Sequence, residues 1–336
     1  MLWTSKINCK YARAAHSSGR RRTCRAQVVN RVQKAYTVFI PAEDHSARHE
    51  SSEDENVSRK TIFPLFIIFF AGLAAAVAAR TYFLLCDIDP NTGFYYSDGT
   101  AVRVFNIFLA AVTIVMLLPL FSKKLRALSA APGHSTAGGI FCAVLAVAML
   151  ADSMSSIADV AARLSGAGAF FSAMLEVLAA ICFMLLAWRS FGAGGTVPAP
   201  VALLPVFWAA LRLMSDFMHY TTVINVSAYL YDMLKMVFVM IFLYYFARYA
   251  GSVPNGHETR GMLAFGLPAA LFCSVSVIPR WTAYLLGAKT TLTPASDLVY
   301  MTLAVYIVWL LVRTFAGAAR RVSDNGGRLH WEAEEK

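Results

Sequence analysis

Eight long apolar runs dominate the sequence of 336 residues, and each is long enough to cross a bilayer as a helix. Crossing about 30 Å of hydrocarbon takes about 20 helical residues. Apolar residues make up 58% of the chain and charged residues only 15%, against about 25% charged in an ordinary soluble domain. The sequence therefore predicts an all-α integral membrane protein whose partner is the lipid bilayer. Its eight transmembrane helices are expected at 62–84, 102–122, 138–162, 168–191, 200–221, 227–249, 261–285 and 295–316.

Basic residues are unevenly shared between the two sides of the membrane that eight spans define. Cytoplasmic loops carry an excess of Lys and Arg, so the richer side is predicted to be cytoplasmic and to hold both termini. The poorer side has Arg80, Arg103, Arg163, Arg280 and Lys289. The richer side has Arg59, Lys60, Lys123, Lys124, Arg126, Arg189, Arg248, Arg260, Arg313, Arg320, Arg321 and Arg328.

Two polar segments flank the predicted eight-span domain, which covers residues 61–317. Residues 1–60 are basic up to Pro41 and then acidic and rich in Ser, with too few apolar side chains to offset the entropy of ordering. Three interpretations remain open for this segment: a disordered cytosolic tail, an Arg-rich organellar presequence, or a start codon placed too early. Residues 318–336 are expected to form a polar cytoplasmic tail.

Several classes of function find no support in the sequence. The net charge of +10 is accounted for by the N-terminal segment and the cytoplasmic loops, so no nucleic-acid partner is expected. The six cysteines contain no CxxC pair, which indicates neither a zinc site nor a disulfide framework. HExxH, GxSxG, Walker and dinucleotide motifs are missing, and no metal or cofactor is expected. An enzymatic function is therefore disfavoured.

Ionisable residues within the predicted spans are the candidate functional residues, because charges inside a membrane are expensive and mark functional sites by default. With the predicted topology, they all fall in the outer halves of their helices. This common depth predicts a polar cavity that opens to the outside. The candidates are Asp152, Asp159, Glu176, Arg212, Asp216, His219, Asp232, Lys235 and Arg280.

These candidates allow three functional hypotheses. In the leading one, the protein is permease-like or binds a small polar or charged solute, with Arg212 and Lys235 facing an anionic group. In the second, it is a non-transporting structural or sensory subunit, whose charges only pair, as Arg212 with Asp216 and Asp232 with Lys235. In the third, it is an intramembrane enzyme that uses His219. The oligomeric state stays open.

The polar stretch CDIDPNTGFYYSDG, residues 86–99, joins the first two predicted spans. Its pattern partly matches a calcium-binding EF-hand loop, but Thr92 stands at the sixth position, where that loop needs Gly. Asp-Pro-Asn-Thr-Gly is instead a good turn sequence. We therefore expect a short external hairpin, whose carboxylates would face an entering solute as a lid: Asp87, Asp89 and Asp98.

Parts of the chain also resemble a known group of proteins. The stretches DPNTGFYY, LPVFWAALRLMSDFMHY, VSAYLYDMLKMVFVMIFLYYFARYAG and MLAFGLPAALF are similar to uncharacterised multi-spanning membrane proteins of clostridia-type Gram-positive bacteria. The resemblance covers about residues 60–316. It implies a bacterial plasma membrane and favours the early-start interpretation of residues 1–56. It implies no activity.

Overall fold

The computed structural model describes residues 47–86, 100–121, 135–162, 167–192, 197–222, 227–251, 258–287 and 293–334. Side chains are described over narrower ranges: 63–86, 100–121, 135–162, 168–192, 197–218, 230–251, 258–287 and 293–315. The chain divides into two compact units, Met1–Asp54 and Glu55–Lys336. The second unit holds the transmembrane helices.

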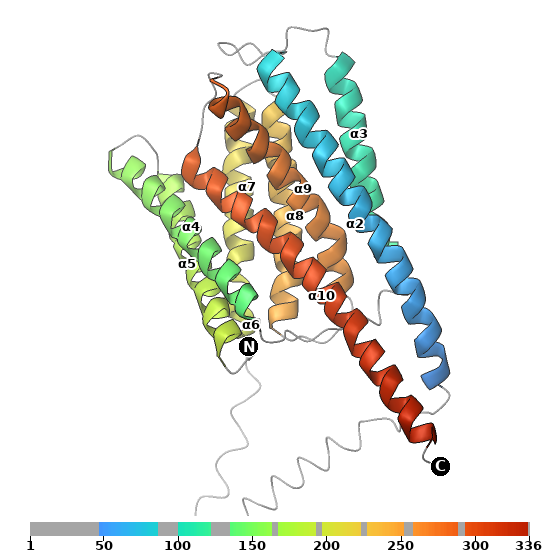
Figure 1. The fold of residues 1–336 in the computed structure, drawn as a ribbon. Helices are drawn as coiled ribbons and strands as arrows, with labels where there is room; N and C mark the ends of the chain where they lie inside the picture. The colour runs from blue at the N-terminus through green and yellow to red at the C-terminus, as the bar shows by residue number, and fades with distance from the viewer. Residues whose placement is uncertain are drawn as a thin grey trace, which may run out of the picture. The chain divides into compact units, whose positions relative to one another are not determined.

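The described residues form helices and no strand (Figure 1). Eight of these helices are long and apolar enough to cross a membrane, which confirms the predicted all-α fold with eight spans. The chain is thus a polytopic membrane protein. The elements are α2 Ala47–Cys86, α3 Thr100–Leu117, the 3₁₀ turn η1 Leu118–Phe121, α4 Thr136–Ala161, α5 Ala167–Phe191, α6 Ala199–Ala202, α7 Leu204–Thr222, α8 Ser227–Ala250, α9 Glu258–Leu285 and α10 Pro294–Glu334.

The first and last helices are longer than the apolar runs inside them. α2 begins at Ala47 and α10 continues to Glu334, whereas the predicted spans are 62–84 and 295–316. Once a span is helical, each added residue gains a hydrogen bond without a new nucleation cost, so the helix extends into polar sequence. The expected hairpin at 86–99, apart from Cys86, and residues 1–46 lie outside the described residues.

Local sequence signals mark where two of the helices begin. The Ser135 hydroxyl accepts a hydrogen bond from the backbone N–H of Gly138 at 3.2 Å, which caps α4 and satisfies one of its free amide groups. α10 starts at Pro294, a residue suited to the first helical position because that position needs no N–H donor. The first turn of α10 therefore has a defined start. This turn carries the polar side chains of Ser296 and Asp297.

Six helices of the bundle follow one another in a closed circuit of contacts. α4 lies against α5, α5 against α7, α7 against α8, α8 against α9, α9 against α10, and α10 returns to α4. α3 and η1 contact α9, and α2 contacts α3, where the ring centroids of Phe83 and Phe105 lie 5.6 Å apart. Helices far apart in the sequence, such as α4 and α10, are thereby brought together.

α9 is the most enclosed span. Of its most apolar stretch, 83% is buried, against 22% to 56% in the other seven spans. It contacts α8, α10, α3 and η1, so protein covers it on several sides. Residues such as Leu263, Leu267 and Leu271 have no exposed surface. A helix that is apolar all round is expected to occupy this interior position.

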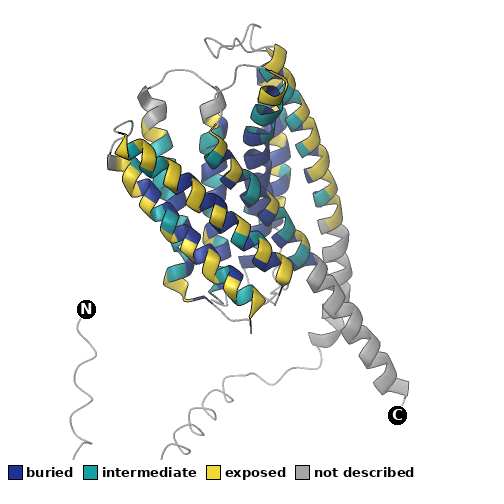
Figure 2. Ribbon diagram, turned by 60° about the vertical axis from the view of Figure 1, so that its left-hand side comes forward, coloured by how far each residue is buried: buried dark blue, intermediate teal, exposed yellow. Residues whose placement is uncertain are grey.

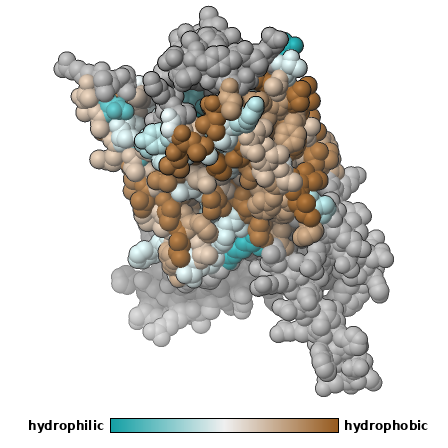
Figure 3. Space-filling model, turned by 45° about the horizontal axis from the view of Figure 1, so that its top comes forward, coloured by the Kyte–Doolittle hydropathy of each residue, from teal (hydrophilic) through white to brown (hydrophobic). Residues whose placement is uncertain are grey.

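The outward faces of the other spans are apolar and exposed. Figure 2 shows exposed residues along the outer faces of the helices, and Figure 3 shows hydrophobic side chains gathered on the surface in view. Phe121, Trp188 and Ile107 are 82%, 79% and 69% exposed. Exposed apolar surface of this extent is not compatible with contact with water. These faces therefore contact the lipid bilayer.

Close approach between α8 and α9 depends on a glycine. A Cβ atom placed at Gly261 would lie 2.4 Å from ring carbons of Tyr245. That ring has little freedom to move, because it stacks on Phe265 with centroids 5.7 Å apart and planes 9° apart. Small residues of this kind let membrane helices approach each other. Gly168 on α5 differs, because a Cβ there would meet no atom within 4 Å.

We predict that Gly261→Ala lowers the stability of the bundle by about 1–3 kcal/mol, the usual cost of overpacking a tight contact. Gly168→Ala is the matched control. It adds the same methyl group in open space and is expected to change stability little, or to raise it through better helix propensity. Unfolding of the two purified variants in one detergent measures the difference. Equal stabilities would contradict the close contact at Gly261.

Candidate functional site

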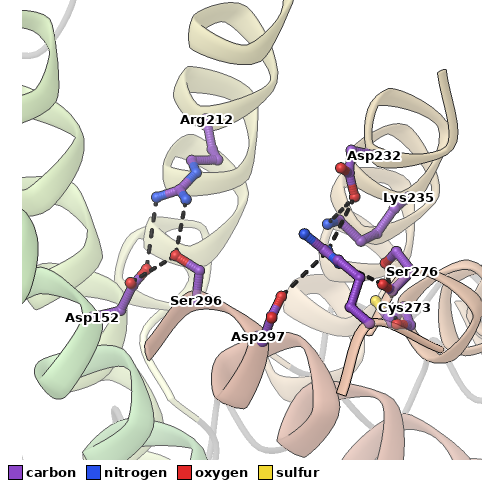
Figure 4. Close-up of polar contacts among 9 residues, drawn as sticks. Asp152, Arg212, Asp232, Lys235, Cys273, Ser276, Ser296 and Asp297 are labelled. Atoms are coloured by element: carbon purple, nitrogen blue, oxygen red, sulfur yellow. Dashed lines mark hydrogen bonds and ion pairs between the residues drawn. The ribbon is translucent and has the colours of Figure 1, made fainter. Parts of the chain in front are cut away.

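The first group of polar contacts joins α4, α7 and α10. The Arg212 guanidinium on α7 donates a hydrogen bond from Nη2 to the Ser296 hydroxyl at 3.2 Å. Ser296 Oγ in turn donates to Asp152 Oδ1 at 2.7 Å, and Arg212 Nη1 lies 3.6 Å from Asp152 Oδ2. Figure 4 shows the Ser296 hydroxyl between the two charges. We call Asp152, Arg212 and Ser296 the triad.

A second group joins α8, α9 and α10 through four charges. Lys235 Nζ lies 2.7 Å from Asp232 Oδ1 on the same helix. Arg280 on α9 lies between two carboxylates, with Nη2 at 3.2 Å from Asp297 Oδ1 and 3.7 Å from Asp232 Oδ1. Its Nε donates to the Ser276 carbonyl at 2.6 Å. Asp232, Lys235, Arg280 and Asp297 form the four-charge group (Figure 4).

The first turns of α10 connect the two groups. Ser296 belongs to the triad and its neighbour Asp297 to the four-charge group. Tyr300 follows one turn later, and Lys235 Nζ lies 3.8 Å from the centroid of its ring, a cation–π contact. Tyr300 also lies close enough to Arg212 to interact with its charge. The triad and the four-charge group therefore form one network.

Glu176 on α5 lies beside the triad. Its side chain has no exposed surface, and neither carboxyl oxygen has a hydrogen-bond partner among the described residues. Asp152, Arg212 and Trp208 are near enough to interact with it. A buried carboxylate without hydrogen bonds is costly, more so in a membrane. Glu176 is therefore the least satisfied charged group among the described residues of the network.

Helices α2 and α3 also contact the network. α2 does so through the Arg80 guanidinium and α3 through the Asn106 amide group. The Tyr231 hydroxyl on α8 donates a hydrogen bond to the Asn106 side-chain oxygen on α3. The Arg80 guanidinium on α2 lies 4.9 Å from the centroid of the Tyr231 ring and is near enough to Asp232 to interact with it. Arg80 is only 6% exposed, so its charge belongs to the buried network and not to the outer surface of the bundle.

The network lies at the end of the bundle where α8 and α10 begin, which we call the network end. Among its described residues, buried or half-buried charges comprise five carboxylates and four cations. When all are ionised, these described residues carry one more negative charge than positive charges. The carboxylates are Asp152, Glu176, Asp216, Asp232 and Asp297, and the cations are Arg80, Arg212, Lys235 and Arg280.

Most of the predicted site residues meet in this network. The predicted pair of Asp232 with Lys235 is present. Arg212 forms an ion pair with Asp152 on another helix, while Asp216, half-buried on α7, is near enough to interact with Arg212. Asp159 is exposed close to the end of α4 and belongs to neither group.

Four predicted residues lie outside the part of the chain whose side chains are described. These are His219 and the three carboxylates expected in a lid, Asp87, Asp89 and Asp98. Their roles stay predictions. Among the described residues, no group of three or more His, Cys, Asp or Glu side chains is placed to hold a metal ion.

Ser296, Asp297, Tyr300 and Arg80 belong to the network but were not among the predicted site residues. Arg80 carried a signal, because an Arg inside a predicted apolar span is itself an intramembrane charge. Asp297 carried the same signal at the start of the last span. Ser296 and Tyr300 carried none, since isolated Ser and Tyr residues are common in membrane helices.

The comparisons with known proteins found no relative of this chain. No protein-family model matches the chain, and neither a curated protein nor a solved structure does.

We predict that Lys235→Met destabilises the bundle by roughly 3–5 kcal/mol, because it leaves the Asp232 carboxylate with less compensation in a buried site. Adding Asp232→Asn should recover part of the loss. Arg103→Met is the matched control, since Arg103 is exposed at the start of α3, near the same end. Melting of the purified variants in one detergent gives the comparison. A double variant no more stable than Lys235→Met would argue against the pair.

Proposed function

We propose that the chain is a permease-like membrane protein that binds a small polar or charged solute at the network. One observation carries this proposal: charged side chains from α4, α5, α7, α8, α9 and α10 converge at one end of the bundle. Ionisable groups inside a membrane are expensive and concentrate where ions or substrates are bound. Helix packing alone is usually achieved with small side chains and with hydrogen bonds between neutral polar ones.

The chemistry of the network suits a solute that carries charge or several hydrogen-bonding groups. Arg212 and Arg280 would bind an anionic group, and the carboxylates of Asp152 and Asp232 would bind a cationic one. Two of the ion pairs are long, at 3.6 Å between Arg212 and Asp152 and 3.7 Å between Arg280 and Asp232. Hydrogen-bonded ion pairs are about 2.7–2.9 Å long. Long pairs exchange partners readily, and this supports a site where a solute replaces them.

A second candidate function is a structural or sensory subunit that transports nothing. It is favoured by the ion pairs themselves, because Arg212, Lys235 and Arg280 each have a carboxylate within 4 Å. On this alternative the charges hold α4, α7, α8, α9 and α10 in register and bind nothing further. It predicts that reversing a pair, as in Arg212→Asp with Asp152→Arg, restores stability and that no solute shifts melting.

We predict that a solute raises the melting temperature of the purified protein. The probes are amino acids, dicarboxylates, polyamines, sugars and nucleosides, each tested at millimolar concentration. A ligand at 100 times its Kd stabilises the folded state by about 2.7 kcal/mol. The shift should disappear in Arg212→Gln, which removes the charge that the triad offers to an anionic group.

Arg248→Gln is the matched control for this experiment. Arg248 pairs with Glu258 at 3.1 Å, but at the opposite end of the bundle, where α8 ends and α9 begins. This variant loses an ion pair without touching the network, so it should keep the solute-induced shift. If no probe shifts melting, or if both variants lose the shift equally, solute binding at the network is ruled out.

We also propose that the network end faces the outside of a bacterial plasma membrane, with both termini in the cytoplasm. The distribution of Lys and Arg between the predicted loops supports this orientation. Arg189, Arg248, Arg260 and Arg313 lie toward the opposite end of the bundle, which would then be cytoplasmic.

Cys86 provides a test of this orientation. It is exposed at the last residue of α2, at the network end, whereas Cys142, Cys182 and Cys273 are buried. We predict that a membrane-impermeant maleimide labels intact bacterial cells expressing the protein, and that Cys86→Ser abolishes this labelling. Labelling of Cys86 only after permeabilisation would reverse the orientation.

A further inference from the structure

We propose that Glu176 is a proton-binding site, and that loss of its proton moves Arg212 from Asp152 to Glu176. This inference rests on the proposed solute-binding function, because it makes the network that binds solute responsive to protons. The permease would then be coupled to a proton gradient.

Three unsatisfied polar groups meet where α5 lies against α7. The carboxyl oxygens of Glu176, the hydroxyl of Ser172 and the indole N–H of Trp208 are buried and have no hydrogen-bond partner among the described residues. Ser172 precedes Glu176 by one turn on α5, and Trp208 precedes Arg212 by one turn on α7. Buried polar groups are normally satisfied, so these three groups are available to bind a further group.

The charges of the described residues favour a single positive charge as that group. With all of them ionised, the five described carboxylates exceed the four described cations by one. Arg212, Lys235 and Arg280 already have carboxylates within 4 Å, whereas Glu176 has no hydrogen-bonding partner of its own among the described residues. One proton on Glu176 removes the excess and leaves a neutral carboxylic acid, which is far cheaper to bury than a carboxylate.

A proton fits this place better than a sodium ion does. A hard metal cation needs several oxygen ligands around it. The surroundings of Glu176 include the Asp152 carboxylate, but also the Arg212 guanidinium and the Trp208 indole N–H, which are donors and disfavour a metal cation. A protonated carboxyl group is compatible with both neighbours, because it can donate its hydrogen to the Asp152 carboxylate and accept from the indole.

The charged and titratable groups that face Glu176 come from three helices. They are Asp152 on α4, Arg212 on α7 and Tyr300 on α10. A negative charge on Glu176 would be repelled by Asp152 and attracted by Arg212. Since Arg212 is near both carboxylates and lies 3.6 Å from Asp152, its position decides which carboxylate is paired.

Deprotonation therefore has a defined structural consequence. The proton passes from the Glu176 carboxyl group to water that enters as the network end opens, and no other bond is made or broken. The new carboxylate attracts Arg212 away from Asp152. Because Ser296 donates to Asp152 and accepts from Arg212, this move breaks the bridge between α7 and the first turn of α10.

Infrared difference spectroscopy of the purified protein tests the proposal, with pH as the only probe. A protonated carboxylic acid has a carbonyl stretch that a carboxylate lacks. We expect this band in the wild type at neutral pH, its loss as pH rises, and its absence in Glu176→Gln. Glu258→Gln is the matched control, because Glu258 is also buried but pairs with Arg248, and it should keep the band.

Asp152→Asn tests the shared arginine. Without the Asp152 charge, Arg212 is free to pair with Glu176, so the band should be missing at neutral pH. A band that persists in Asp152→Asn overturns the movement of Arg212, and a band that persists in Glu176→Gln overturns the site. If Glu176→Gln fails to fold, Glu176→Asp decides, since it keeps a carboxyl group and should shift the band in frequency. Loss of the wild-type band on adding sodium chloride at constant pH would assign the site to sodium and overturn the proposal.

The outcomes separate this inference from the proposed function. The infrared measurement contains no solute, so the proton site stands or falls without one. A protein that is stabilised by a solute but shows no pH-dependent band at Glu176 keeps the solute-binding function and loses the proton site. A protein with the band and no stabilising solute keeps the proton site and loses the coupling to solute.

Discussion

The cost of placing charge in a low-dielectric interior governs the arrangement of this bundle. An ionised side chain inside a membrane needs an opposite charge or hydrogen bonds within a few ångströms. Here the first turn of α10 meets that need for two sets of charges at once, through Ser296 toward α4 and α7 and Asp297 toward α9. The contacts of this first turn therefore fix two things: which helices lie beside α10, and where in the bundle the network forms.

The two ends of the bundle differ in kind. Away from the network, the core is aromatic: Phe183, Phe246, Tyr306 and Trp309 lie in mutual ring contact. Such contacts are insensitive to pH and to solutes. The network end holds long ion pairs, and its described residues carry more carboxylates than cations. Under the proposed function, stability and response to ligands belong to opposite ends of the same helices.

Apolar run length was enough to predict the fold. The predicted span at 168–191 agrees closely with the observed Gly168–Phe191, because hydrocarbon thickness dictates its length. The common depth of the charged residues was also predictable, since depth follows from topology. The ion-pair partner of Arg212 was not predictable. The i, i+4 spacing on one helix favours Asp216, whereas the packing of α7 against its neighbours brings Arg212 to Asp152. Likewise, nothing local indicates that Glu176 lacks a partner, because that depends on how α5 is rotated toward α4 and α7.

The enclosure of α9 has a mechanical consequence. Lipid chains are fluid and fill the space behind a helix that shifts, so a helix with one face in the bilayer moves without leaving a void. α9 has protein on several sides, and displacing it would open gaps that nothing refills, at a cost that grows with the empty volume. Displacing α4 or α5, which expose side chains such as Val147 and Trp188, therefore costs less than displacing α9.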